Sequence, residues 1–139
     1  MLKTMCVLYA KGESLIFDSD VLIWLLRGNS NAERKVLKEA PFKISAVTYM
    51  ELIQGMRNKS EFAALQKTLK KLDVEIIHID KEISQKALAF VEKFYLSHSA
   101  EMGDALIAAT CLKYNEILCT ANDKHYKVFD KLRLDVFRQ

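Results

Sequence analysis

The sequence predicts an α/β fold: a three-layer α/β/α sandwich with a short, mainly parallel central sheet. Two observations lead to this prediction. Short apolar, strand-like runs such as residues 14–18 and 116–120 recur along the chain. They are separated by amphipathic stretches of about 10 to 15 residues, the spacing of strands and helices that builds a parallel sheet covered on both faces.

Each strand-like run is followed by a helix signal. Residues 14–18 are a candidate buried strand, and residues 20–28 a helix that stops near Gly28. A second short helix, residues 31–40, stops before Pro41. The strand at residues 42–45 ends in Ser45, which is suited to cap a helix over residues 46–58.

The second half repeats this alternation. The next helix, residues 59–73, has the apolar stripe Phe62, Leu65, Leu69 and Leu72. After it come a strand at residues 74–79 and a long helix at residues 81–98, capped by Asp80. The remaining expected elements are an apolar helix at residues 103–115, a strand at 116–120, a short helical piece at 125–130 and a last strand at 132–137.

Composition limits the possible classes of protein. The 139 residues suffice for one domain, residues 1–139, and their balance (50% apolar, 28% charged, four glycines, one proline) is typical of a globular fold. The longest uncharged apolar stretch, residues 105–112, is far shorter than the roughly 20 residues of a membrane helix. The first twelve residues do not form a convincing signal peptide. We therefore expect a soluble, cytoplasmic protein.

The cysteines and the net charge constrain the function less than the overall composition does. Cys6, Cys111 and Cys119 are odd in number and lack CxxC spacing, so neither a disulfide nor a zinc site is expected. The net charge of +3 comes from residues 124–139. That basic segment could attract phosphate, although a solvated surface explains it equally well.

Carboxylates follow the strands at the edge where a parallel sheet binds its ligands. Asp18 and Asp20 come after the first strand, Glu51 lies in the helix after the second, Asp104 opens the apolar helix, and Asp123 follows the penultimate strand. Singly, the aspartates have ordinary explanations as helix caps or Asx turns, and Glu51 as a solvent-facing residue. Together, these acids would repel one another in a cleft unless a cation neutralised them. Mg²⁺ or Mn²⁺ fits, because both prefer oxygen ligands and no His or Cys cluster competes.

Four segments resemble the acidic motifs of PIN-domain ribonucleases, most closely the VapC toxins of toxin–antitoxin pairs: FDSDVLIWLL, TYMEL, GDALIAAT and TANDKHYKVF. The resemblance begins near residue 14 and leaves residues 1–13 outside. It implies that Asp18, Glu51, Asp104 and Asp123 are the catalytic and metal-binding acids. Ala121 takes the position of the family's threonine, Thr120 lies one residue earlier, and Asn122 could share the role of Asp123.

The resemblance implies Mg²⁺- or Mn²⁺-dependent hydrolysis of RNA to products with a 5′-phosphate and a 3′-hydroxyl. It also implies a VapB-like antitoxin as partner. The apolar residues Trp24, Leu25, Leu26, Tyr49, Met50, Ile53 and Met56 suggest a homodimer, with core packing as an even alternative.

Two other functions remain open from the sequence. FDSD also resembles the first motif of haloacid dehalogenase-like phosphatases, although Val21 stands where that family has glycine. In that family Asp20 would transfer a proton, whereas in a ribonuclease it would only support the site. The other possibility is an inactive PIN-like RNA-binding protein, which the retention of all the acids disfavours.

Overall fold

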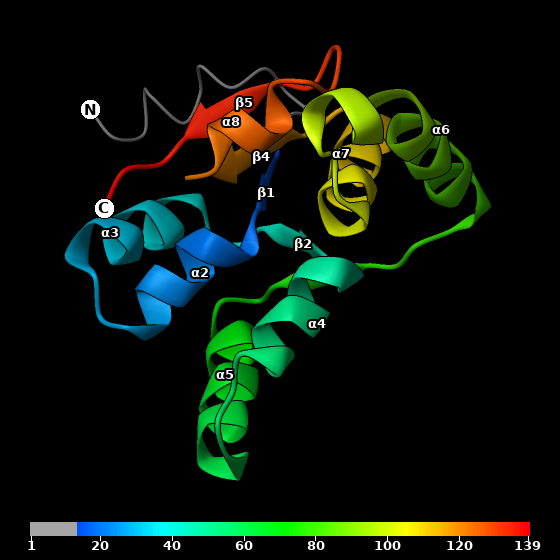
Figure 1. Cartoon of the computed structure of the whole chain (residues 1–139). Coiled ribbons are helices and arrows are strands. Elements are labelled where there is room, and N and C mark those ends of the chain that lie inside the picture. The colour runs from blue at the N-terminus through cyan, green and yellow to red at the C-terminus, as the bar shows by residue number, and fades with distance from the viewer. Residues whose placement is uncertain (1–13) are drawn as a thin grey trace.

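The computed structural model describes residues 14–139 (Figure 1). The expectations for residues 1–13, including the absence of a signal peptide and the state of Cys6, lie outside the described residues. Five short strands form one sheet in the order β3–β2–β1–β4–β5, and all neighbouring strands are parallel. The strands are β1 (Leu15–Phe17), β2 (Lys43–Ser45), β3 (Glu75–Ile77), β4 (Ile117–Thr120) and β5 (Leu134–Val136).

Helices connect the strands and form the two outer layers (Figure 1). They are α2 (Ser19–Leu26), α3 (Ser30–Glu39), α4 (Ala46–Gln54), α5 (Lys59–Lys71), α6 (Lys81–His98), α7 (Met102–Tyr114) and α8 (Asp123–Tyr126). The predicted three-layer α/β/α sandwich with its short parallel sheet is confirmed.

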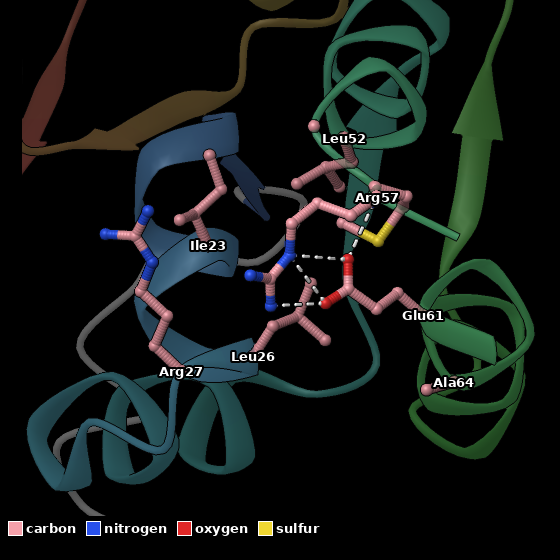
Figure 2. Close-up of a pocket in the computed structure, with 9 residues that line it drawn as sticks. Ile23, Leu26, Arg27, Leu52, Arg57, Glu61 and Ala64 are labelled. Carbon is pink, nitrogen blue, oxygen red and sulfur yellow. Dashed lines mark hydrogen bonds and ion pairs between the residues drawn. The ribbon is translucent and has the colours of Figure 1, made fainter. Parts of the chain in front are cut away.

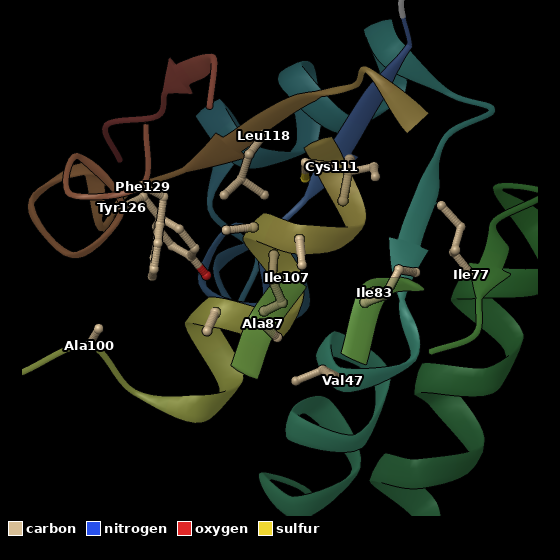
Figure 3. Close-up of a cluster of buried hydrophobic side chains, with 14 residues drawn as sticks. Val47, Ile77, Ile83, Ala87, Ala100, Ile107, Cys111, Leu118, Tyr126 and Phe129 are labelled. Atoms are coloured by element: carbon tan, nitrogen blue, oxygen red, sulfur yellow. The ribbon is translucent and has the colours of Figure 1, made fainter. Parts of the chain in front are cut away.

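The sheet separates two hydrophobic cores. Because successive side chains of a strand point to opposite faces, Ile16 enters one core while Leu15 and Phe17 enter the other. The first core lies against α6 and α7 and includes Ile107 and Tyr126 (Figure 3). The second lies against α2, α3 and α5. Both faces of the sheet are therefore buried, as the near-continuous apolar strands require.

Helix ends largely follow the sequence signals. The Ser45 hydroxyl accepts a hydrogen bond from the Val47 amide at 3.1 Å, and the Asp80 carboxylate accepts one from the Ile83 amide at 2.9 Å, so both predicted caps are confirmed. The helix predicted over residues 46–58 is wrong at its end. It stops at Gln54 with Gly55 as its C-cap, and Asn58 caps the next helix.

None of the helices within residues 14–139 combines the length and apolar character that crossing a bilayer requires.

Candidate functional site

The sheet order brings the carboxyl ends of β1 and β4 side by side at one edge of the sheet. From the central strand β1 the sheet continues to β2 on one side and to β4 on the other. Connections that leave neighbouring strands in opposite directions open a ligand crevice at this edge of a parallel sheet. Asp18 follows β1 directly, and Thr120 ends β4. Acids far apart in sequence are thereby brought to one edge.

Asp18 is buried at the centre of this edge, with 4% of its surface exposed. It caps α2, and its Oδ1 accepts a hydrogen bond from the Ser19 amide at 2.8 Å. Its Oδ2 accepts one from the Thr120 hydroxyl, also at 2.8 Å. Burial raises the pKa of Asp18, and these hydrogen bonds partly oppose that shift. The side chain is thus held in a fixed orientation, without a direct cationic partner among residues 14–139.

Asp20 ties the start of α2 to the segment after β4. Its Oδ1 accepts from the Val21 amide at 2.7 Å and its Oδ2 from the Ala121 amide at 2.9 Å. Burial, followed by the charge of Asp18, raises the pKa of Asp20 to about 6. Both oxygens already have backbone donors. This arrangement suits a supporting residue better than a group that must exchange protons with a substrate.

Glu51 turns inward from α4. Its Oε1 is buried and has no hydrogen-bond partner within the described residues. Burial and then the charge of Asp18 raise the pKa of Glu51 to about 7, and Asp104 and Asp20 contribute in the same direction. A Cβ atom on Gly103 would lie 3.6 Å from Glu51 Oε2, so the start of α7 adjoins this carboxylate. The interpretation of Glu51 as a solvent-facing residue is therefore wrong.

Asp104 lies in the first turn of α7. The N-cap of this helix is Glu101, so the interpretation of Asp104 as its cap is wrong. Burial raises the pKa of Asp104, and the charge of Asp18 adds to the shift. The Nδ1 atom of His125 lies 3.5 Å from Asp104 Oδ2. His125 was not expected at the site from the sequence. Its position two residues after Asp123 was the one feature that could have indicated it.

Asp123 differs from the other acids because cations surround it. Its Oδ1 accepts a hydrogen bond from Arg138 Nη2 at 2.9 Å, and its Oδ2 lies 3.4 Å from Lys127 Nζ. Arg138, more than any other group, lowers the pKa of Asp123. The charge of Asp123 is therefore already balanced by these two cations. Next to it, the Asn122 side chain makes no capping hydrogen bond to α8.

Thr120 is a site residue that the sequence analysis assigned poorly. The hydroxyl position of the motif fell on Ala121, whose methyl group cannot donate a hydrogen bond. In the structure the Thr120 hydroxyl bonds Asp18, and it also accepts a hydrogen bond from the Asn122 amide at 2.9 Å. It therefore links β1 to the segment that carries Asn122 and Asp123.

The donor set suits a hard divalent cation. Asp18, Glu51 and Asp104 supply only oxygen, each pKa is raised, and Glu51 Oε1 lacks a partner. As placed, no three His, Cys, Asp or Glu side chains in residues 14–139 are grouped closely enough to hold one ion. Like charges without a counter-ion repel one another, so side-chain rotation is needed before these oxygens can share a cation.

A separate cavity of about 630 Å³ lies between α2, α4 and α5 (Figure 2). Its walls include Ile23, Leu26 and Leu52, and the Arg57 guanidinium crosses it to bond Glu61. None of the five acids lines it. The cavity is therefore a candidate surface for a partner and not part of the acidic site.

The chain is similar in sequence and in fold to known proteins. The chain is 33% identical over 123 residues to Ribonuclease VapC10 of Mycobacterium tuberculosis, covering 86% of this chain and 90% of that protein. A toxin–antitoxin complex from Klebsiella pneumoniae contains a chain with a TM-score of 0.69 and 26% identity, covering 86% of this chain and 95% of that one.

VapBC2 from Rickettsia felis, solved on a DNA fragment from its promoter, shares the fold with a TM-score of 0.73 at 16% identity, over 89% of this chain and 98% of that one. The family profile described as PIN domain matches residues 15–132. The resemblance drawn from the four acidic motifs is thereby confirmed, and this chain belongs to the PIN-domain family.

Proposed function

We propose that this chain is an endoribonuclease that depends on Mg²⁺ or Mn²⁺ and acts as the toxin of a toxin–antitoxin pair. One observation carries the proposal: in a PIN-domain chain, Asp18, Glu51 and Asp104 meet at the carboxyl edge of the sheet without enough positive charge to balance them. The similarity to a protein named as a ribonuclease supports the reaction.

The residues have distinct roles in this proposal. Asp18, Glu51 and Asp104 would hold the cation, which, when bound, polarises the phosphoryl group and lowers the pKa of a bound water. Thr120 and the Ser19 amide keep Asp18 oriented. Asp123, with Asn122 as its alternative, would complete the site at the rim. Lys124 and Lys127 are suited to contact RNA phosphates without distinguishing bases.

Cleavage of total RNA by the purified chain, free of any partner protein, tests the proposal. We expect cleavage with Mg²⁺ or Mn²⁺ that stops in excess EDTA, with 5′-phosphate and 3′-hydroxyl ends on the products. Cleavage that continues unchanged in EDTA would rule out the metal mechanism. Hydrolysis of a small phosphate monoester without RNA cleavage would favour the phosphatase alternative, and RNA binding without cleavage the inactive one.

We propose an antitoxin as the protein partner and the cavity between α2, α4 and α5 as part of its docking surface. The neighbouring structure described as a toxin–antitoxin complex supports the partner, and the apolar walls support the location. Leu26→Asp, in the cavity wall, should abolish co-purification with the product of an adjacent reading frame. The matched control Leu37→Asp alters an exposed leucine of α3 and should not. Equal capture by both variants would contradict the location.

A homodimer is also proposed, but through a different surface from the one that the sequence suggested. Of the seven apolar residues on α2, on α4 and just after α4, only Leu26 and Met50 are exposed, and the others pack against the second core. More exposed apolar side chains lie on α6 and α7: Leu88, Tyr95, Leu96 and Met102. Light scattering should give a dimer that Leu96→Asp disrupts. A wild-type monomer at high micromolar concentration would contradict it.

A further inference from the structure

Tyr126, the last residue of α8, has a buried hydroxyl group without a clear structural purpose. The residue is 1% exposed, and its ring packs against Phe129 with centroids 6.1 Å apart. The ring accounts for the burial, but a phenylalanine would fill the same space. The hydroxyl makes no hydrogen bond of ordinary geometry with any described residue. Leaving a buried hydroxyl unpaired is unfavourable, so its presence needs an explanation.

Three acids of the candidate site, Asp18, Asp104 and Glu51, lie near this hydroxyl. In Figure 3 the ring reaches from α8 toward α7, with its oxygen at the inner end. The hydroxyl is near enough to Asp18 and Asp104 to lower the pKa of each carboxylate, although neither contact has hydrogen-bond geometry. Burial and these negative charges raise the pKa of Tyr126 itself, so the hydroxyl keeps its proton and can donate it in a hydrogen bond to a carboxylate.

Of these two aspartates, Asp104 has fewer hydrogen bonds to hold it. Each Asp18 oxygen already accepts one, from the Ser19 amide and from the Thr120 hydroxyl. Within residues 14–139, Asp104 accepts no hydrogen bond of that length, and the His125 imidazole lies 3.5 Å away and is 62% exposed. The half-buried side chain of Asp104 is therefore less restrained than that of Asp18, although the proposed site needs its orientation fixed.

We propose that Tyr126 is a positioning residue: its hydroxyl donates a hydrogen bond to one Asp104 oxygen when a cation is bound, and so directs the other oxygen at the ion. This inference rests on the proposed metal site. Hydrogen-bond partners of metal ligands typically change metal affinity by about 10- to 100-fold when removed. The Tyr126 hydroxyl would then gain its hydrogen-bond partner only when the cation is bound.

Tyr126→Phe tests the inference, because it removes the hydroxyl and keeps the ring. Binding of Mn²⁺ to the full chain is measured by titration calorimetry, and the melting temperature is measured without metal. We expect Mn²⁺ binding about 10-fold weaker than wild type, with a metal-free melting temperature that is unchanged or higher. Tyr114→Phe, a variant of a partly exposed tyrosine of α7, is the matched control and should leave both values unchanged.

Three outcomes would overturn the inference. Wild-type Mn²⁺ affinity in Tyr126→Phe would contradict it and leave the metal site intact. A lower metal-free melting temperature in Tyr126→Phe would mean that the hydroxyl holds the fold itself and not Asp104. Absence of Mn²⁺ binding by the wild-type chain would overturn the metal site and this inference together.

Discussion

Two glutamates at opposite ends of the sheet differ in what surrounds their charge. Glu116, just before β4, is 4% exposed, and it accepts hydrogen bonds from the Ser14 amide at 2.8 Å and from Lys43 Nζ at 3.0 Å. Glu51, at the other end, has a buried oxygen without a partner in the described residues and a pKa raised to about 7. Glu116 joins the starts of three strands, while Glu51 faces other acids.

The difference separates a structural acid from a functional one. Burying a carboxylate is costly unless hydrogen bonds and an opposite charge compensate, and Glu116 has both. The acids at the carboxyl edge lack that compensation, so they destabilise the metal-free protein and are available to a cation. Asp123 is intermediate, since it lies at the functional edge but is paired with Arg138 and Lys127.

The largest expected effect comes from neutralising one acid at each end of the sheet. Asp18→Asn should lower RNA cleavage by about 10³-fold or more, since the charge stabilisation lost is several kcal/mol. Its melting temperature should not fall, because the buried charge is removed and the Thr120 hydroxyl, unlike the backbone amides that bond Asp20, can turn to accept from the new amide group. Glu116→Gln should do the opposite: normal cleavage, with stability lower by about 1–3 kcal/mol. Cleavage rates and thermal melts of both variants check this, and the reverse pattern would refute the comparison.

Asp20→Asn separates a supporting acid from a catalytic one. It should keep most RNA cleavage, because Asp20 only braces the crevice; a general acid or base would contribute about 10² to 10⁴ in rate. Stability should fall by about 1–3 kcal/mol, since both Asp20 oxygens accept backbone amides and asparagine has one acceptor oxygen. If Asp20→Asn is as inactive as Asp18→Asn while folded and binding metal, these roles are wrong.

The pH dependence of stability should expose the uncompensated acids. Folding raises the pKa of Glu51 to about 7 and that of Asp20 to about 6. Between their unfolded values and these values the folded protein binds more protons, so stability falls as pH rises. Without metal, the protein should melt a few °C higher near pH 5.5 than near pH 8. In Glu51→Gln this difference should shrink.

Stabilisation by a bound metal should increase with pH, opposite to the trend of the metal-free protein, because the ligands must be deprotonated. The rise in melting temperature on adding Mn²⁺ should be larger near pH 8 than near pH 5.5. A stabilisation by Mn²⁺ that is independent of pH would indicate that the ion binds elsewhere.

The smallest effect is expected at Asp123. Because Arg138 and Lys127 already balance its charge, Asp123→Asn should lower cleavage by about 10-fold or less, far below the loss in Asp18→Asn. Asn122→Ala, assayed beside it, tests whether the neighbouring amide carries the role instead. A loss in Asp123→Asn equal to that in Asp18→Asn would make Asp123 a full member of the site.

Local sequence by itself determined the order of the elements, the parallel sheet and the edge where the acids gather. Alternating apolar residues, the caps Ser45 and Asp80, and the breakers Gly28 and Pro41 act over a few residues, so they can be recognised without a structure. The end of α4 was misplaced because Gly55 and Asn58 favour a break there but do not oblige it.

Only the tertiary structure decided which acids are compensated. Arg138, which follows β5, bonds Asp123; Thr120 bonds an aspartate 102 positions away, and Lys43 neutralises Glu116. The inward hydroxyl of Tyr126 likewise depends on how α8 packs against α7. Such contacts depend on side chains that converge from different strands and helices. The electrostatic cost of a buried charge is set by those distant neighbours, and residue spacing along the chain does not encode it.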